Sequence, residues 1–231
     1  MDNTLAHLSA LRQVFMRAVL GYAVIAVIAA LCAKPLFTVF AAPIMALLPS
    51  GSLIATGIAT PFLVPLTFSL MFALCIAMPW ILYQGWLFIA PGLFVHEKKR
   101  ILLLTSFSFI LFYTGIGFAY FFVIPLALDF FVHAAPVGVT VLTDVDAYFG
   151  FAIKLMIAFG LAFQVPLVVM ALVKSGAVTR ESLMAKRPYV IIACFVLGML
   201  LTPPDVFSQT LLAVPMWMLF ELGLFLTKKD L

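Results

Sequence analysis

No Lys, Arg, Asp or Glu occurs between Pro35 and His96, and this stretch constrains the fold more than any other feature. A water-soluble domain needs polar side chains over its surface, whereas this chain is 66% hydrophobic and 10% charged. Transmembrane helices remove that need, because about 20 apolar residues cross the hydrocarbon core of a bilayer. The sequence therefore predicts an all-α, polytopic membrane protein.

Six apolar segments are candidate spans: residues 14–33, 66–90, 101–125, 148–173, 188–202 and 206–227. The intervening residues 35–65 are rich in Pro and Gly, so we expect an irregular, partly amphipathic segment at the membrane surface. The fifth span, about 15 residues or about 22 Å of helix, is short against a hydrocarbon core of about 30 Å. We expect it to thin the bilayer locally.

Six spans would gather most basic residues on one side of the membrane. These are Arg12, Arg17, Lys98, Lys99, Arg100, Lys174, Arg180, Lys186, Arg187, Lys228 and Lys229. The positive-inside rule makes that side the cytoplasm, which then also holds both termini. The net charge of +4 fits anionic lipid headgroups better than nucleic acid, because the basic residues form short clusters between apolar runs.

Several sequence blocks have a familiar order. They are HLSALRQ, FIAPGLFVHEKKR, FAYFFVIPLALDFF, FGLAFQVPL and KRPYVIIACFVLGMLLTPPDVFSQTLLAVPMWMLFELG. Together they resemble the TatC family, the multispanning receptor subunit of the twin-arginine protein translocase. The resemblance covers nearly the whole chain, and the last block is highly specific.

The resemblance implies one cup-like domain, residues 1–231, in the bacterial inner membrane. It implies no enzymatic activity, no cofactor and no metal site. The implied partners are twin-arginine signal peptides, TatA-type and TatB-type single-span proteins, and further copies of the chain. Together they would export folded proteins using the proton-motive force.

Glu97 is the strongest candidate for binding such a peptide. It is the only carboxylate between the second and third expected spans, and carboxylates accept bidentate hydrogen bonds from guanidinium groups. The alternative is that Glu97 only offsets the neighbouring lysines in a solvated turn. Phe88, Pro91 and Phe94 would supply apolar surface beside the carboxylate, or would only anchor the chain at the interface.

Arg12 and Lys99 match the family by position. Neither cation can bind guanidinium directly, so they would orient Glu97 or contact peptide carbonyls, or would only set the topology. The family pattern His-Leu-x-Glu-Leu-Arg has Ala10 here in place of its glutamate. Recognition would then depend on Glu97 alone, or be shared with a partner.

Gln164 is an amide near the middle of the fourth span, where the family often has a glutamate. A polar side chain in hydrocarbon indicates a partner or a function, so a partner's transmembrane helix could dock there. The alternative is a hydrogen bond between helices of this chain. An amide does not ionise, so Gln164 cannot relay a proton.

Asp205 is placed to cap the last span, with a gating or assembly role as the second interpretation. Gln209 lies one turn further on, and Pro43 matches a family proline that would fix the bend of its loop. Glu221 either bonds a neighbouring helix or faces lipid headgroups. Lys154 could extend its side chain to the membrane surface.

Two other classes of protein fit the sequence less well. A proton-coupled secondary transporter should show repeated halves and several ionisable groups within its spans, and this sequence shows neither. An intramembrane hydrolase needs a nucleophile and a base at one depth. His7, His96 and His133 all lie in or near expected loops.

Overall fold

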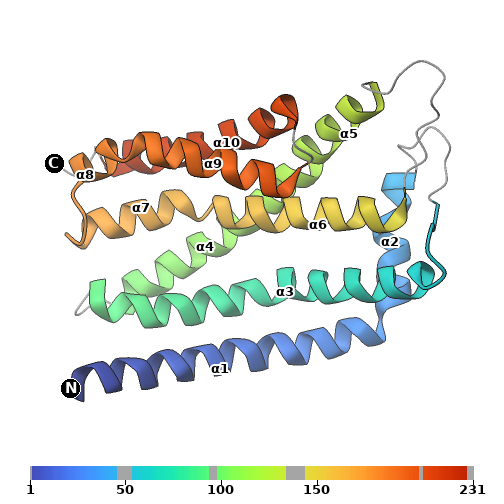
Figure 1. Ribbon diagram of the computed structural model, residues 1–231. Helices are drawn as coiled ribbons and strands as arrows, with labels where there is room; N and C mark the ends of the chain where they lie inside the picture. The colour runs from blue at the N-terminus through green and yellow to red at the C-terminus, as the bar shows by residue number, and fades with distance from the viewer. Residues whose placement is uncertain (1, 46–53, 94–97, 134–143, 203–204, 228–231) are drawn as a thin grey trace. The chain divides into compact units, whose positions relative to one another are not determined.

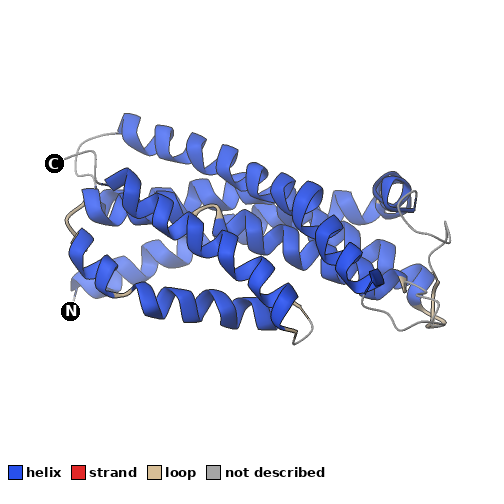
Figure 2. Ribbon diagram, turned by 90° about the horizontal axis from the view of Figure 1, so that it is seen from above, coloured by secondary structure: helices blue, strands red, loops and turns tan. Residues whose placement is uncertain are grey.

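The computed structural model describes residues 2–45, 54–93, 98–133, 144–202 and 205–227. In these ranges its regular elements are helices (Figures 1 and 2). One isolated β-bridge pairs Ile54 with Asp144. The helices are α1 (Asp2–Leu31), α2 (Ala33–Met45), α3 (Thr60–Leu93), α4 (Lys98–Phe118), the π-helix η1 (Ala119–Val123), α5 (Ile124–His133), α6 (Val145–Ala162), α7 (Val165–Lys174), α8 (Arg180–Ala185), α9 (Arg187–Leu201) and α10 (Val206–Leu226). The all-α prediction is confirmed.

The spans predicted from the sequence each have a helical counterpart. In the described part of the chain, five helical stretches are long and apolar enough to cross a membrane: Leu11–Leu31, Thr60–Leu87, Leu103–Phe131, Val145–Lys174 and Val206–Leu226. The sixth, α9, is a shorter apolar helix of 15 residues. The prediction of a short fifth span is therefore confirmed.

Two local expectations were wrong. Residues 33–45 form α2 instead of an irregular segment, because Pro35 falls in the first turn, where a missing backbone N–H costs nothing. The fourth span is also not continuous, since Phe163 and Gln164 form a turn between α6 and α7. Pro166 follows in the first turn of α7 and cannot donate the hydrogen bond that a continuous helix would need.

The chain divides into two compact units, each described by itself, and their boundary passes through α3, α5 and α6. The first unit comprises residues 1–84 and 128–153. Its aromatic cluster joins α2, α3 and α6 through Phe37, Phe40, Phe68, Phe72 and Phe149. These rings bury apolar area that α2 could not bury alone.

Helix α1 meets α3 in the first unit through small residues. Ala26 and Ala29 pack on Ala73. Gly21 leaves room for the Trp80 ring, because a Cβ atom at position 21 would lie 2.5 Å from that ring. Trp80 Nε1 donates a 3.0 Å hydrogen bond to the Arg17 carbonyl. Small residues allow the two helix backbones to approach closely, as is common between membrane helices.

The second unit comprises residues 85–127 and 154–231. In it, α10 packs on both α7 and α9. Val169 of α7 forms a buried cluster with Phe220 and Leu224 of α10, and Leu183 of the short α8 packs against that cluster. Helix α8 is thus held against the last span.

Candidate functional site

Most residues predicted to bind a signal peptide fall, in the sequence, at the end of α3, at the start of α4 or between them. Glu97 and Phe94 lie between Leu93 and Lys98, outside the described residues. Phe88 and Pro91 belong to α3 and Lys99 to the first turn of α4, but their side chains fall outside the described part. In the sequence, Glu97 directly precedes Lys98, the first residue of α4.

Arg12 is separate from these residues in the sequence and lies on α1. Its side chain is exposed and lines a hollow together with Gln13, Met16 and Arg17. The two guanidinium groups give this face of α1 a positive charge. Such a face attracts carbonyl oxygens and phosphates and repels a cationic peptide segment.

A buried polar network joins three helices of the second unit. Trp86 Nε1 donates a 2.7 Å hydrogen bond to Ser108 Oγ, and Gln164 Nε2 donates a 3.1 Å bond to the Ser108 carbonyl. Gln164 is 7% exposed, and its Oε1 atom has no hydrogen-bond partner among the described residues. The amide therefore makes the interhelical bond that the sequence offered as an alternative, and keeps one buried acceptor.

Two glycines allow α4 and α6 to come close enough for this network. A Cβ atom on Gly115 would lie 2.6 Å from the Phe159 carbonyl oxygen. A Cβ atom on Gly160 would lie 2.6 Å from the Phe112 ring. The contact at Gly115 is to backbone, which cannot move aside as a flexible side chain can.

The connection between α9 and α10 is organised by polar side chains. Asp205 Oδ1 accepts a 2.7 Å hydrogen bond from the Ser208 N–H, which confirms its predicted role as an N-cap. Gln209 Nε2 donates to the Phe195 carbonyl at 2.9 Å, and Thr202 Oγ1 donates to the Gly198 carbonyl at 2.9 Å. Pro43 was predicted to fix the bend of a loop, and this was wrong: residue 43 lies in α2, with its side chain outside the described part.

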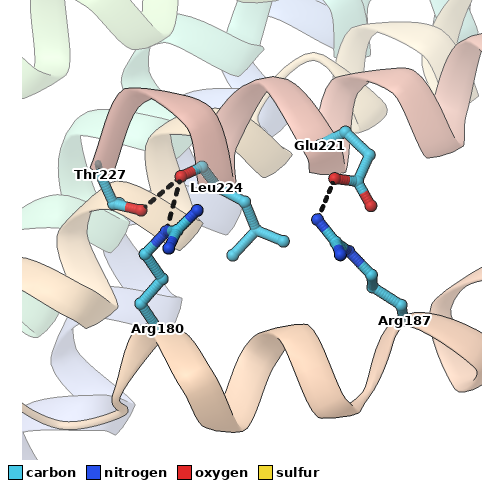
Figure 3. A network of polar contacts seen from close by, with 5 residues as sticks. All are labelled: Arg180, Arg187, Glu221, Leu224 and Thr227. Carbon is cyan, nitrogen blue, oxygen red and sulfur yellow. Dashed lines mark hydrogen bonds and ion pairs between the residues drawn. The ribbon is translucent and has the colours of Figure 1, made fainter. Parts of the chain in front are cut away.

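The opposite ends of α9 and α10 are joined by an ion pair (Figure 3). Arg187 Nη2 donates to Glu221 Oε2 at 2.7 Å, and Arg180 Nε donates to the Leu224 carbonyl at 3.3 Å. Thr227 Oγ1 also donates to the Leu224 carbonyl, at 2.7 Å. Glu221 therefore bonds a neighbouring helix, one of the two roles left open by the sequence.

Sequence reasoning missed Arg187, Arg180, Trp86 and Ser108 as structural partners. The ion pair could have been suspected, because α9 and α10 are antiparallel neighbours with opposite charges near the same end. The Trp86–Ser108 bond carries no such signal, since serines are frequent in membrane helices. In the described ranges, no group of three His, Cys, Asp or Glu residues could hold a metal ion.

These features define the class of a multi-pass helical membrane protein whose spans are joined by a few polar contacts. A family model described as "Sec-independent protein translocase protein (TatC)" matches residues 6–215. The chain belongs to the TatC family. It is accordingly a component of a protein translocase, a transport protein.

Known proteins with this description are similar over nearly the full chain. The TatC protein of Azotobacter chroococcum mcd 1 is 50% identical over 95% of this chain and 87% of its own length. That of Escherichia coli (strain K12) is 44% identical over 97% of this chain and 87% of its own. A crystal structure described as "Twin Arginine Translocase Receptor- TatC in DDM" has a TM-score of 0.88 at 38% identity, covering 96% of this chain and 99% of that one.

Proposed function

We propose that this chain is the receptor of a twin-arginine translocase and binds twin-arginine signal peptides next to Glu97. The similarity to a crystal structure of a twin-arginine translocase receptor, with a TM-score of 0.88, carries the proposal. Glu97 adds the chemistry, because it is a carboxylate residue that falls between α3 and α4 in the sequence. Two guanidinium groups presented there would find the planar, bidentate acceptor that they prefer.

The remaining residues of the proposed site act around this carboxylate. Phe88, Pro91 and Phe94 supply apolar surface for the hydrophobic part of the peptide. Arg12 and Lys99 orient Glu97 or bind peptide carbonyls, since cations repel guanidinium. With Ala10 in place of the family's glutamate, this chain has one fewer carboxylate than the family pattern for holding the arginine pair.

The proposed site lies on the cytoplasmic face of the bacterial inner membrane, with both termini on that face. The distribution of basic residues supports this orientation. With TatA-type and TatB-type single-span partners and further copies of itself, the chain would export folded proteins at the expense of the proton-motive force. Gln164 would not carry the proton, because an amide does not titrate.

A photo-crosslinking amino acid at position 94 tests the site directly while Glu97 stays intact. In native membranes, a precursor with paired arginines should crosslink from position 94, and its Lys-Lys counterpart should crosslink much less. Position 58, in an exposed turn before α3, is the matched control and should capture neither precursor. Equal capture of both precursors at position 94 would contradict the proposal that twin-arginine peptides bind next to Glu97.

The buried acceptor of Gln164 supports a second element of the proposal. A partner's single transmembrane helix would donate a hydrogen bond to Gln164 Oε1 near the middle of the fourth span, and the helices around Gln164 would have to part for this, because the atom is buried within the chain. Gln164→Glu retains an acceptor and should preserve cysteine crosslinking to the partner helix, whereas Gln164→Leu should weaken it. Full crosslinking and full export in Gln164→Leu would limit Gln164 to packing within the chain.

A further inference from the structure

Lys34 and Lys154 stand apart from the other basic residues. Lys34 follows the end of α1, and Lys154 lies inside α6. Both side chains are exposed, and neither bonds a side chain or carbonyl among the described residues. An ammonium group beside hydrocarbon is costly, so each needs water or an anionic group outside the protein.

The length of the fourth span fixes the depth of Lys154. The apolar stretch Val145–Lys174 has 30 residues and, with the short turn between α6 and α7 counted at the helical rise, is up to about 45 Å long against a hydrocarbon core of about 30 Å. An ordinary tilt of about 20° absorbs only a few ångströms of this excess. Lys154 and Lys174 are separated by about 30 Å at 1.5 Å per residue. The hydrocarbon therefore fits between these two lysines.

The first span leads independently to the same conclusion. Leu11–Leu31 has 21 residues, or about 31 Å of helix, which matches the hydrocarbon core. Arg12 lies at one end of this stretch, and Lys34 follows three residues beyond the other end. In each span, a basic residue at one interface is thus separated from a lone lysine by about one hydrocarbon thickness.

We propose that Lys34 and Lys154 bind phosphate groups of phospholipids in the leaflet opposite Arg12 and Lys174, and so fix the depth of the protein. Lipid phosphates lie at this boundary along the whole membrane, and an ammonium group offers each up to three hydrogen bonds. A carboxylate on a partner helix would be needed only at a greater depth. The proposal does not depend on signal-peptide binding.

The packing of the first unit agrees with this boundary. Residues 145–153 of α6 and the helix α2 would then stand outside the hydrocarbon. Phe149 of that segment is 3% exposed and contacts Phe37 and Phe68, so protein surrounds it. A segment outside the bilayer must bury its large rings in this way, because no lipid chains cover them.

Depth measurements test the boundary. Spin labels are placed at exposed positions between residues 147 and 161 and between residues 24 and 39 in a variant without native cysteines, reconstituted in nanodiscs. The accessibility ratio of oxygen to a polar nickel reagent should cross the hydrocarbon boundary within one turn of residue 154 and of residue 34. A crossing more than two turns from either lysine would overturn the assignment for that lysine.

Lipid retention tests the binding and needs no cysteine replacement. Protein released from nanodiscs of phosphatidylglycerol and phosphatidylcholine is analysed by native mass spectrometry. Lys154→Gln and Lys34→Gln should each weaken the retention of one bound phosphatidylglycerol about fivefold and leave the other bound lipids unchanged, the effect expected of one lysine at an anionic surface. Lys154→Arg and the neutral control Ala147→Ser, at an exposed position of α6, should retain wild-type amounts. Unchanged retention in either Gln variant would show that this lysine binds no lipid phosphate.

Discussion

Gln164 and Lys154 are polar residues of the same span, but their side chains have opposite surroundings. Gln164 is buried and bonds the Ser108 carbonyl on a neighbouring helix. Lys154 is exposed and has no partner among the described residues. The first side chain belongs to the packing between spans, whereas the second belongs to the contact between the span and its surroundings. Substitutions at such inward and outward positions should therefore affect different measurements.

The largest effect is expected where the backbones cross next to Gln164. Gly115→Leu should destabilise the fold by about 3 kcal/mol, because the new side chain would clash with the Phe159 carbonyl oxygen, and this backbone atom cannot move aside. Thermal unfolding in detergent measures the loss. The control is Gly117→Leu, where a Cβ atom meets nothing within 4 Å. Equal losses in both variants would show that the crossing is looser than described.

Breaking the second inward contact should have the next largest effect. Glu221→Ala leaves Arg187 without its carboxylate, and because the two side chains are 28% and 39% exposed we expect about 1 to 2 kcal/mol. Glu181→Ala, on the exposed face of α8, is the matched control and should be neutral. The Arg187→Ala, Glu221→Ala double variant should be less destabilised than the sum. Strict additivity would mean that the pair contributes no coupling.

Gln164→Leu should lower stability by about 0.6 to 2 kcal/mol, the usual range for one hydrogen bond between membrane helices. Val168→Leu, one turn further along the same span, serves as a control because the Val168 side chain is exposed. Unfolding in a mild detergent with added lipid reports the difference. If Gln164→Leu instead raised the stability, the amide would be destabilising in the fold, and its role would be functional and not structural.

The smallest effect on folding is expected at the outward lysine. Lys154→Leu should change the free energy of unfolding in detergent by less than about 0.5 kcal/mol, because surface changes away from packed features are nearly neutral. The same protein in nanodiscs should lose lipid retention, so one variant separates folding from membrane contact. A large destabilisation in detergent would place a partner for Lys154 within the chain.

The elements of the fold could be predicted from the sequence where the sequence signals agreed with one another. Apolar length, the Pro- and Gly-rich segment 35–65 and the distribution of basic residues together predicted the six spans, and a carboxylate before an apolar run predicted the Asp205 cap. Prediction from the sequence failed at prolines, because a proline can either interrupt a helix or occupy its first turn. Pro35 was read as breaking a helix, although it starts one, and Pro166 was not recognised as dividing the fourth span.

The partners of buried polar groups were the least predictable feature. Gln164 could have bonded any helix, and only the close crossing at Gly115 and Gly160 selects the Ser108 carbonyl. Arg187 and Glu221 are distant in the sequence and meet because α9 packs on α10. The site around Glu97 rests on the family resemblance and on guanidinium chemistry, and it stays a prediction.

The affinity for twin-arginine peptides tests the central claim most directly. Calorimetry on the full chain in nanodiscs would compare a signal peptide containing Arg-Arg with its Lys-Lys counterpart, for the wild type, Glu97→Gln, Glu97→Ala and Ala10→Glu. We expect preference for Arg-Arg, a loss of about 10- to 100-fold in Glu97→Ala with a smaller loss in Glu97→Gln, and tighter Arg-Arg binding in Ala10→Glu. Equal affinities for both peptides across wild type and variants would contradict the proposed receptor site.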